Sequence, residues 1–143
     1  MKKFVPALII FFVTVAGMRA LQTETPVDYF IRYQTMIADG RTFEDDAQFY
    51  AASRRAEIQT QLDAQGDQAE GMKSAYLEMT TRQAKCSELA LAEETKTETS
   101  ARLVFDVTDT CGAYDADAKV QEIIELIEED GDWKILSNTT SVK

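Results

Sequence analysis

The spacing of apolar residues changes after Lys85, and this change constrains the fold more than any other feature of the chain. Before Lys85, apolar residues recur every three or four positions, as they do on one face of a helix. After it, they alternate with polar residues, as they do along a strand buried on one side. Helices followed by strands predict an α+β domain, with helices covering one face of a curved antiparallel sheet.

The first predicted helix has start and stop signals at both ends. Thr25 is the expected N-cap, Pro26 occupies the first helical position, and Asp28 completes a capping box. Gly40 is expected to end the helix, because glycine adopts the backbone conformations that close a helix without steric cost.

Three more helical segments are predicted before Lys85. One begins at residues 42–45 and continues through Phe49 and Tyr50, and the next opens at Ser53 and ends at Gly66. Residues 67–70 (Asp-Gln-Ala-Glu) form a further capping box. The helix that follows is expected to place four apolar residues on one face: Met72, Ala75, Tyr76 and Met79.

The second half reads as an antiparallel meander. The clearest strand alternates Ala101, Leu103, Phe105 and Val107 with polar residues, and the threonine-rich residues 95–99 before it suggest a hairpin loop. Residues 120–129 fit a helix or a strand, and their β-branched content favours a strand. The Glu-Asp-Gly-Asp sequence at residues 129–132 is a good turn before a last strand that begins with Trp133.

The N-terminus resembles an export signal. Lys2 and Lys3 precede a run of 15 uncharged residues, from Phe4 to Met18, which is shorter than the roughly 20 apolar residues of a membrane-spanning helix. We expect residues 1–20 to be a cleaved signal peptide and residues 21–143 to form one domain, periplasmic or secreted. An uncleaved inner-membrane anchor is the alternative, and a buried core helix fits the lysine start poorly.

Composition excludes several classes of function. Three of the 15 basic residues lie within residues 1–20, so 12 would face 25 acidic residues in the mature chain, for a net charge of −13. Such a surface repels phosphate backbones and anionic lipids, so we expect neither nucleic-acid binding nor membrane insertion after cleavage. The chain has no histidine, which excludes Ser-His-Asp and Cys-His catalysis and nearly all zinc sites. We predict no catalytic residue, no metal site and no cofactor.

Cys86 and Cys111 are expected to form a disulfide, because they lie near the far ends of a predicted hairpin in an oxidising compartment. Two free thiols are the alternative, and the absence of a Cys-X-X-Cys spacing argues against redox catalysis. Placing Cys86 opposite Cys111 would put Leu89 opposite Thr108 and split the apolar faces. We therefore expect either a β-bulge or a bridge made from the loop after Val107.

The order of elements resembles the NTF2-like superfamily, which includes ketosteroid-isomerase-like and SnoaL-like proteins. It is most similar to small exported bacterial domains of uncharacterised function that are related to proteins designated lumazine-binding. Three stretches carry the resemblance: residues 25–30 with 39–41, residues 49–55, and the acidic-Gly turn followed by Trp-Lys-Ile at residues 128–135. The resemblance implies a curved sheet wrapped over helices around a pocket, often with a homodimer through the sheet. It implies no single chemistry, because this fold carries enzymes and binding modules.

Five aromatic residues are our candidates for lining such a pocket: Tyr29, Tyr33, Tyr50, Tyr76 and Phe105. For the tyrosines, which sit at helical spacings, packing in the core is the simpler interpretation. With Asp28 the tyrosines are also the pieces from which an isomerase-like site could be built, although capping is the simpler role of Asp28. The aspartates at 106, 109, 115 and 117 lack the spacing of an EF-hand loop and read as a solvated acidic loop.

These observations predict an exported, non-enzymatic domain that binds a small apolar molecule or an envelope protein. A cofactor-free isomerase or dehydratase with an Asp/Tyr pocket is the first alternative. A structural subunit of a cell-envelope assembly is the second, and an exposed apolar sheet face would be its signature.

Overall fold

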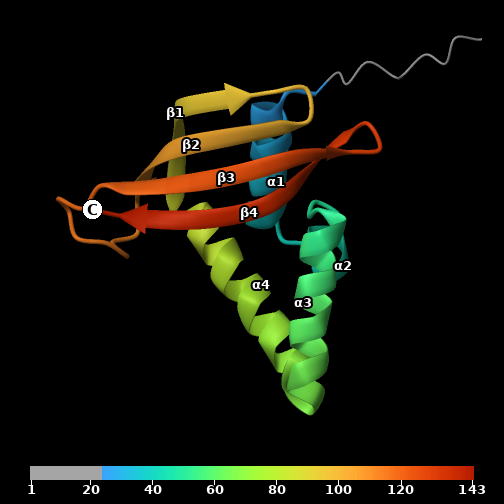
Figure 1. Cartoon of the computed structure of the whole chain (residues 1–143). Helices are drawn as coiled ribbons and strands as arrows, with labels where there is room; N and C mark the ends of the chain where they lie inside the picture. Colours follow the sequence, from blue (N-terminus) through green and yellow to red (C-terminus); the bar gives the residue numbers. More distant parts are fainter. Residues whose placement is uncertain (1–23) are drawn as a thin grey trace, which may run out of the picture.

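The computed structural model describes residues 24–143 as helices followed by a four-stranded antiparallel sheet (Figure 1). The predicted signal peptide, residues 1–20, lies outside the described residues. The helices are α1 (Pro26–Asp39), α2 (Phe43–Ala47), α3 (Ala52–Gln65), the 3-10 turn η1 (Gly66–Gln68) and α4 (Ala69–Lys85). The strands are β1 (Ser87–Lys96), β2 (Ser100–Asp109), β3 (Val120–Glu129) and β4 (Asp132–Val142), in the spatial order β1-β2-β3-β4.

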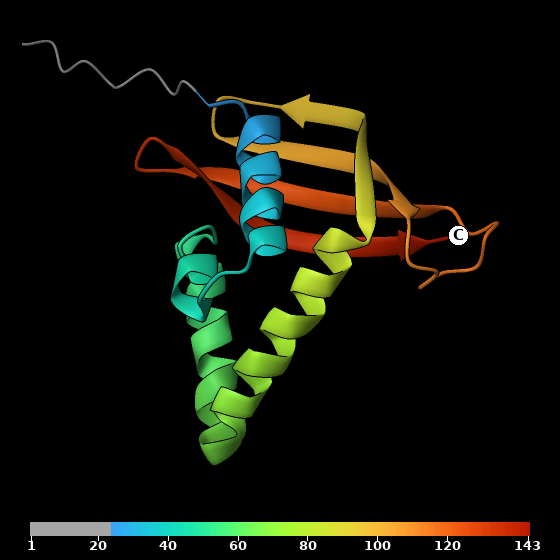
Figure 2. The same ribbon diagram turned by 180° about the vertical axis from the view of Figure 1, so that it is seen from behind.

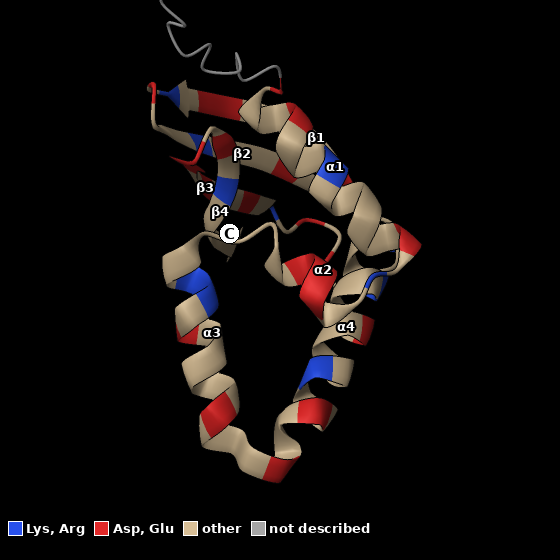
Figure 3. Cartoon of the chain, turned by 90° about the vertical axis from the view of Figure 1, so that its right-hand side faces the viewer, with Lys and Arg blue, Asp and Glu red and all other residues tan. Residues whose placement is uncertain are grey.

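Helix α1 lies against one face of the sheet, whereas α3 and α4 extend away from it and meet at η1 (Figures 1 and 2). The two arms of this hairpin diverge towards the sheet, and both carry acidic and basic residues along their length (Figure 3). The α+β class predicted from the change in apolar spacing is therefore confirmed: helices precede an antiparallel meander, and α1 packs on one face of it (Figure 1).

The predicted ends of α1 are confirmed. Thr25 Oγ1 accepts a hydrogen bond from the backbone N–H of Asp28 at 3.1 Å and donates to the carboxylate of the same residue at 2.8 Å. Gly40, with φ 89°, is the C-cap at which the helix ends. Between these caps α1 buries Tyr29, Phe30, Tyr33 and Ile37.

Helix α2 is shorter than predicted, because Phe49 and Tyr50 leave it. The backbone N–H of Ala51 donates to the carbonyl of Ile135 at 2.8 Å, and the N–H of Ile135 donates to the carbonyl of Phe49 at 2.8 Å. Residue 50 thereby forms a parallel β-bridge with residue 135 beside β4. These two backbone hydrogen bonds to the sheet replace those that a longer helix would have formed.

The predicted starts of α3 and α4 differ from the observed ones. Helix α3 begins at Ala52 rather than Ser53, and the cap comes from β3: the carboxylate of Glu129 accepts from the Ala52 N–H at 3.0 Å. The capping box predicted at residues 67–70 is absent, because its expected N-cap, Asp67, lies inside the 3-10 turn η1, and no side-chain hydrogen bond caps the start of α4. The predicted apolar face of α4 is also largely uncovered, with Met72 and Met79 each 46% exposed.

The strand prediction for residues 120–129 is confirmed, since they form β3 between β2 and β4. Asp130 (φ 54°) and Gly131 (φ 88°) make the two-residue turn into β4, and two successive positive φ angles are the signature of a type I′ hairpin turn. The predicted loop at residues 95–99 is shorter, because β1 continues to Lys96. Inward-facing side chains from the strands complete the core: Ala101, Leu103, Phe105, Ile124, Leu126, Trp133 and Ile135.

The predicted disulfide is present between Cys86, at the end of α4, and Cys111, in the loop after β2. The observed register pairs Leu89 with Val107 and Leu91 with Phe105, so the apolar faces stay together. The bridge made from the loop, one of the two expected solutions, therefore reconciles the disulfide with the hairpin. A β-bulge does occur in this hairpin, between Leu91 and Glu93, away from the bridge.

Trp133 lies in the core, as predicted, with 2% of its surface exposed. Replacing Trp133 with Ala should lower the free energy of unfolding by about 3–5 kcal/mol, because it removes the largest buried side chain and leaves a cavity. Chemical denaturation measures this loss. The matched control is Tyr114→Ala, since Tyr114 is 37% exposed and its truncation should cost much less. Equal, small losses for both variants would contradict a packing role for Trp133.

Candidate functional site

A buried carboxylate on α2 joins this helix to α1 and α4. Asp46 on α2 and Arg41 in the loop before it have side chains that are 3% and 1% exposed. Nε and Nη2 of Arg41 donate to Oδ1 of Asp46 at 3.0 and 2.9 Å. Thr42 caps α2 through the backbone N–H of Asp45, which fixes the turn that brings the two charges together.

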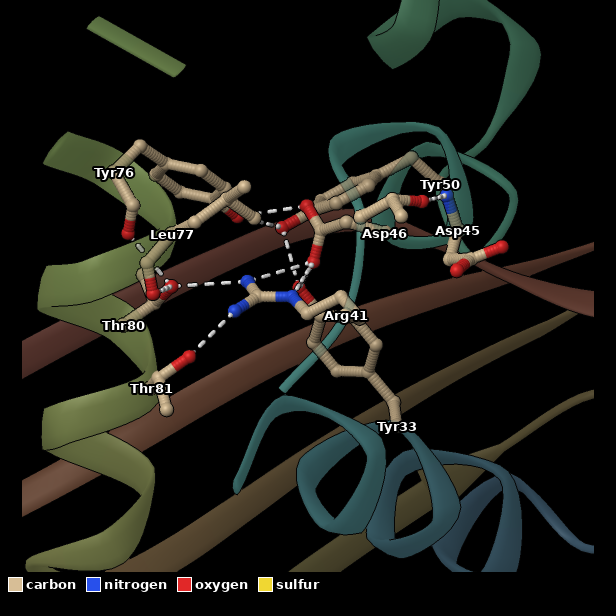
Figure 4. A network of polar contacts seen from close by, with 10 residues as sticks. Tyr33, Arg41, Asp45, Asp46, Tyr50, Tyr76, Leu77, Thr80 and Thr81 are labelled. Carbon is tan, nitrogen blue, oxygen red and sulfur yellow. Dashed lines mark hydrogen bonds and ion pairs between the residues drawn. The ribbon is translucent and has the colours of Figure 1, made fainter. Parts of the chain in front are cut away.

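Three tyrosines surround this ion pair (Figure 4). The hydroxyl of Tyr33 on α1 donates to Oδ1 of Asp46 at 3.0 Å, and that of Tyr76 on α4 donates to Oδ2 at 3.0 Å. The hydroxyl of Tyr50 lies 2.9 Å from that of Tyr33 and 3.2 Å from that of Tyr76. Burial raises the pKa of Tyr33 and Tyr76, so both phenols remain neutral at physiological pH.

Arg41 also ties this cluster to α4. Its Nη2 donates to Thr80 Oγ1 at 2.9 Å and its Nη1 to Thr81 Oγ1 at 3.2 Å, while its guanidinium lies 5.6 Å from the centre of the Tyr76 ring. Burying two charges is costly unless their hydrogen-bonding groups are satisfied. Here the carboxylate accepts four hydrogen bonds, two from Arg41 and one each from Tyr33 and Tyr76.

The positions of the hydroxyl protons follow from this geometry. Each phenol has one proton, and those of Tyr33 and Tyr76 go to the carboxylate, which is the strongest acceptor in reach. Tyr50 must then donate to the oxygen of Tyr33 or Tyr76. Tyr50 is left with its own oxygen lone pairs, so towards any further group it is a hydrogen-bond acceptor.

A cavity of about 320 Å³ lies beside this cluster, between α1, α4 and the inward-facing residues of β2, β3 and β4. Tyr33, Tyr50 and Tyr76 border it on the helical side. Ile37 and Val120 supply apolar surface, and the disulfide-linked Cys86 lies in the wall near the loop that follows β2. The volume is within the range of small-molecule sites in proteins.

Glu122 is the acidic residue of β3 that faces this cavity. Its Oε1 accepts from Nδ2 of Asn138 on β4 at 2.8 Å and, at 3.4 Å, from Nε2 of Gln34 on α1. Burial raises the pKa of the Glu122 carboxyl, and the hydrogen bond from Asn138 opposes that shift. Among the described residues no Lys or Arg forms an ion pair with it.

The five candidate pocket residues divide into two groups. Tyr33, Tyr50 and Tyr76 border the cavity, whereas Tyr29 and Phe105 pack in the core away from it. The hydroxyl of Tyr29 donates to the carbonyl of Phe49 at 2.8 Å, and the carboxylate of Asp28 accepts from the hydroxyl of Thr25, the N-cap of α1. For Tyr29 and Phe105 the packing interpretation fits the structure.

Sequence reasoning missed three residues of this site. Glu122 could have been found from the sequence, because it is an acidic residue at an inward-facing position of β3, between the apolar residues Val120 and Ile124. Asp46 and Arg41 had none, since their burial depends on α1 and α4 closing around them.

The acidic loop after β2 provides no metal site. Asp109 accepts from the backbone N–H groups of Cys111 and Tyr114, both at 2.9 Å, and these hydrogen bonds lower the pKa of its carboxyl. Within residues 24–143 no group of three or more His, Cys, Asp or Glu side chains is placed to hold a metal ion. In the same part of the chain, no helix is long and apolar enough to cross a membrane.

No protein-family model, curated protein or solved structure significantly matches this chain. The α+β architecture stands on the structure itself, and the resemblance to the NTF2-like superfamily stays a prediction.

The buried ion pair makes a prediction about stability. Asp46→Asn should lower the free energy of unfolding by about 3–5 kcal/mol, because it leaves the Arg41 guanidinium buried without a countercharge. Urea denaturation measures the loss. The control is Asp45→Asn, which changes an exposed carboxylate on the same short helix and should leave the free energy of unfolding nearly unchanged. If both variants unfolded at the same urea concentration, the ion pair would not support the fold as described.

The raised pKa of Glu122 predicts a pH-dependent effect of Glu122→Gln. The folded state binds this proton more tightly than the unfolded chain, so stability from this group is present at low pH. It is lost as the pH rises from the ordinary glutamate pKa through the raised one. The variant, which cannot ionise, should therefore gain stability relative to the wild type as the pH rises from 4 to 8. Paired thermal unfolding at both pH values measures the difference, and a constant difference would contradict the prediction.

Proposed function

We propose that this chain is an exported, non-enzymatic domain that binds a small molecule in the cavity, and that its fold is NTF2-like. The observation that carries the proposal is the 320 Å³ cavity beside a polar cluster whose hydrogen bonds are satisfied without a ligand. A wall of this kind keeps its shape when the cavity is empty, so fewer side chains have to be ordered when a ligand binds, and the entropic cost of binding is lower. The order of helices followed by a meander, and the cavity between the helices and the sheet, support the fold assignment.

The disulfide supports the proposed compartment. Cys86 and Cys111 are bridged, and such bonds persist mainly in oxidising compartments outside the cytoplasm. This agrees with the lysine-led apolar start of the chain, from which we propose a periplasmic or secreted protein.

Glu122 favours one rival function, a cofactor-free isomerase or dehydratase. Such an enzyme needs a carboxylate base in the cavity and a phenol or protonated acid that donates to the developing enolate oxygen. Glu122 suits the first role by its position and its raised pKa. The tyrosines suit the second poorly, because Tyr33 and Tyr76 direct their protons to Asp46 and Tyr50 donates to one of them. We therefore place binding without chemistry first.

An envelope-assembly role would be favoured by a continuous apolar face on the sheet. The large apolar side chains that are exposed in residues 24–143 are spread over several elements instead: Ile31, Met72, Met79, Leu91, Tyr114 and Val142. This distribution gives less support to assembly, or to a homodimer through the sheet, than the cavity gives to ligand binding.

Two neighbouring residues of β4 allow a matched test of the cavity. Thr140 borders it, whereas Thr139 alternates to the other face of the sheet, and both are exposed. Thr140→Trp should fill the cavity and abolish small-molecule binding, and Thr139→Trp should not. Binding is measured by ligand-detected NMR with a mixed set of neutral, anionic and cationic small molecules. Absence of any hit, or hits that survive Thr140→Trp, would refute the proposed function.

A further inference from the structure

We propose that the ligand of this cavity is a small primary amine, bound as its ammonium ion by the carboxylate of Glu122. The inference rests on the proposed function and adds the chemical class of the ligand. It follows from the hydrogen-bonding capacity of the groups that border the cavity.

Glu122 has one oxygen that is available to a ligand. Its Oε1 accepts from Asn138 and Gln34, whereas its Oε2 accepts no hydrogen bond from the described residues. No Lys or Arg of residues 24–143 forms an ion pair with this carboxylate. A carboxylate that is largely removed from water gains most from a partner that brings a positive charge and a hydrogen-bond donor together.

The shape of the acceptor favours an ammonium over other cations. A guanidinium binds best through two parallel hydrogen bonds to both carboxylate oxygens, and Oε1 is already occupied. A divalent metal needs several oxygen ligands. Asp109 is the other acidic residue that borders the cavity, but its carboxylate oxygens already accept hydrogen bonds from two backbone N–H groups, so the lining does not suit a metal. A single free oxygen suits the compact, multiply donating head of a primary amine.

Tyr50 supplies a second acceptor in the lining of the cavity. Its proton goes to Tyr33 or Tyr76, so its oxygen can receive a hydrogen bond from the ligand and cannot give one. The apolar side chains of Ile37, Val107 and Val120 also border the cavity and suit the hydrocarbon part of an amine. A ligand that pairs an ammonium head with a small apolar body matches both parts of the lining.

The charge of the protein agrees with a cationic ligand. The described residues contain all 25 acidic residues of the chain and 12 basic ones, and such a surface concentrates cations around it. Arg54 also borders the cavity, but its Nη1 donates to Glu57 on the same helix at 2.7 Å. Its charge is therefore partly balanced on α3, and it forms no ion pair with Glu122, while its Nε is buried without a hydrogen-bond partner among the described residues.

Isothermal titration calorimetry with 2-phenylethylamine at pH 7.5 tests the proposal. The amine should bind, and its neutral counterpart 2-phenylethanol should bind about tenfold or more weakly, because it lacks the charge-assisted hydrogen bond. Glu122→Gln should weaken binding of the amine by a similar factor and leave binding of the alcohol unchanged. Glu125→Gln is the charge-matched control, since Glu125 is exposed on the other face of β3, and it should bind the amine as the wild type does.

The outcomes separate the inference from the function on which it rests. Equal binding of amine and alcohol by the wild-type protein would overturn the inference without recourse to any variant. Equal effects of Glu122→Gln and Glu125→Gln would also overturn it, because they would reduce Glu122 to a contributor of overall charge. If neutral or anionic molecules bind and Thr140→Trp removes them while the amine does not bind, the cavity is a binding site and the proposed ligand class is wrong. If nothing binds, both proposals fail.

Discussion

A negative charge buried beneath the sheet determines how the helices of this protein are arranged. The carboxylate of Asp46 can remain buried only if donors surround it, and these come from α1, from the loop before α2 and from α4. Apolar contacts alone would allow these helices to shift by small amounts at little cost. Four hydrogen bonds at about 3 Å to one carboxylate allow far less movement, so the helical wall of the cavity has a defined shape.

The same cluster controls what the cavity wall offers to a ligand. Tyrosine hydroxyls usually both donate and accept, but here Asp46 takes the protons of Tyr33 and Tyr76, and Tyr50 gives its own to one of these neighbours. Glu122, which also borders the cavity, accepts hydrogen bonds as well when it is ionised. The chemistry of the cavity is thus determined partly by a group that lies outside it. Sites with an unpaired acceptor of this kind commonly lower the stability of the folded state, which agrees with the raised pKa of Glu122.

Local signals predicted those parts of the fold that depend on neighbouring residues. Thr25 and Gly40 bound α1 as expected, and the alternation of residues 101–107 and the turn at Gly131 defined the last three strands. Predictions failed where a distant partner decides the outcome. Tyr50 leaves α2 because the backbone of Ile135 offers hydrogen bonds to its neighbours. Ala52 starts α3 because its N–H is capped by Glu129, a residue far away in the sequence. For the site, the tyrosines could be predicted, but the buried Arg41–Asp46 pair could not, since no short-range pattern distinguishes it from exposed charges.

The parallel bridge between residues 50 and 135 has a consequence for the order of folding. Each strand pair of the sheet and each helix involves residues close in sequence and can begin to form early. The bridge instead closes a loop of more than half the chain, and it positions Tyr50, one of the three tyrosines of the polar cluster that border the cavity. The cavity therefore takes its final shape only after β4 has joined the sheet. A chain that stalls before that step can hold its helices and hairpins while still lacking a competent site, so ligand binding reports on completed folding rather than on secondary structure content.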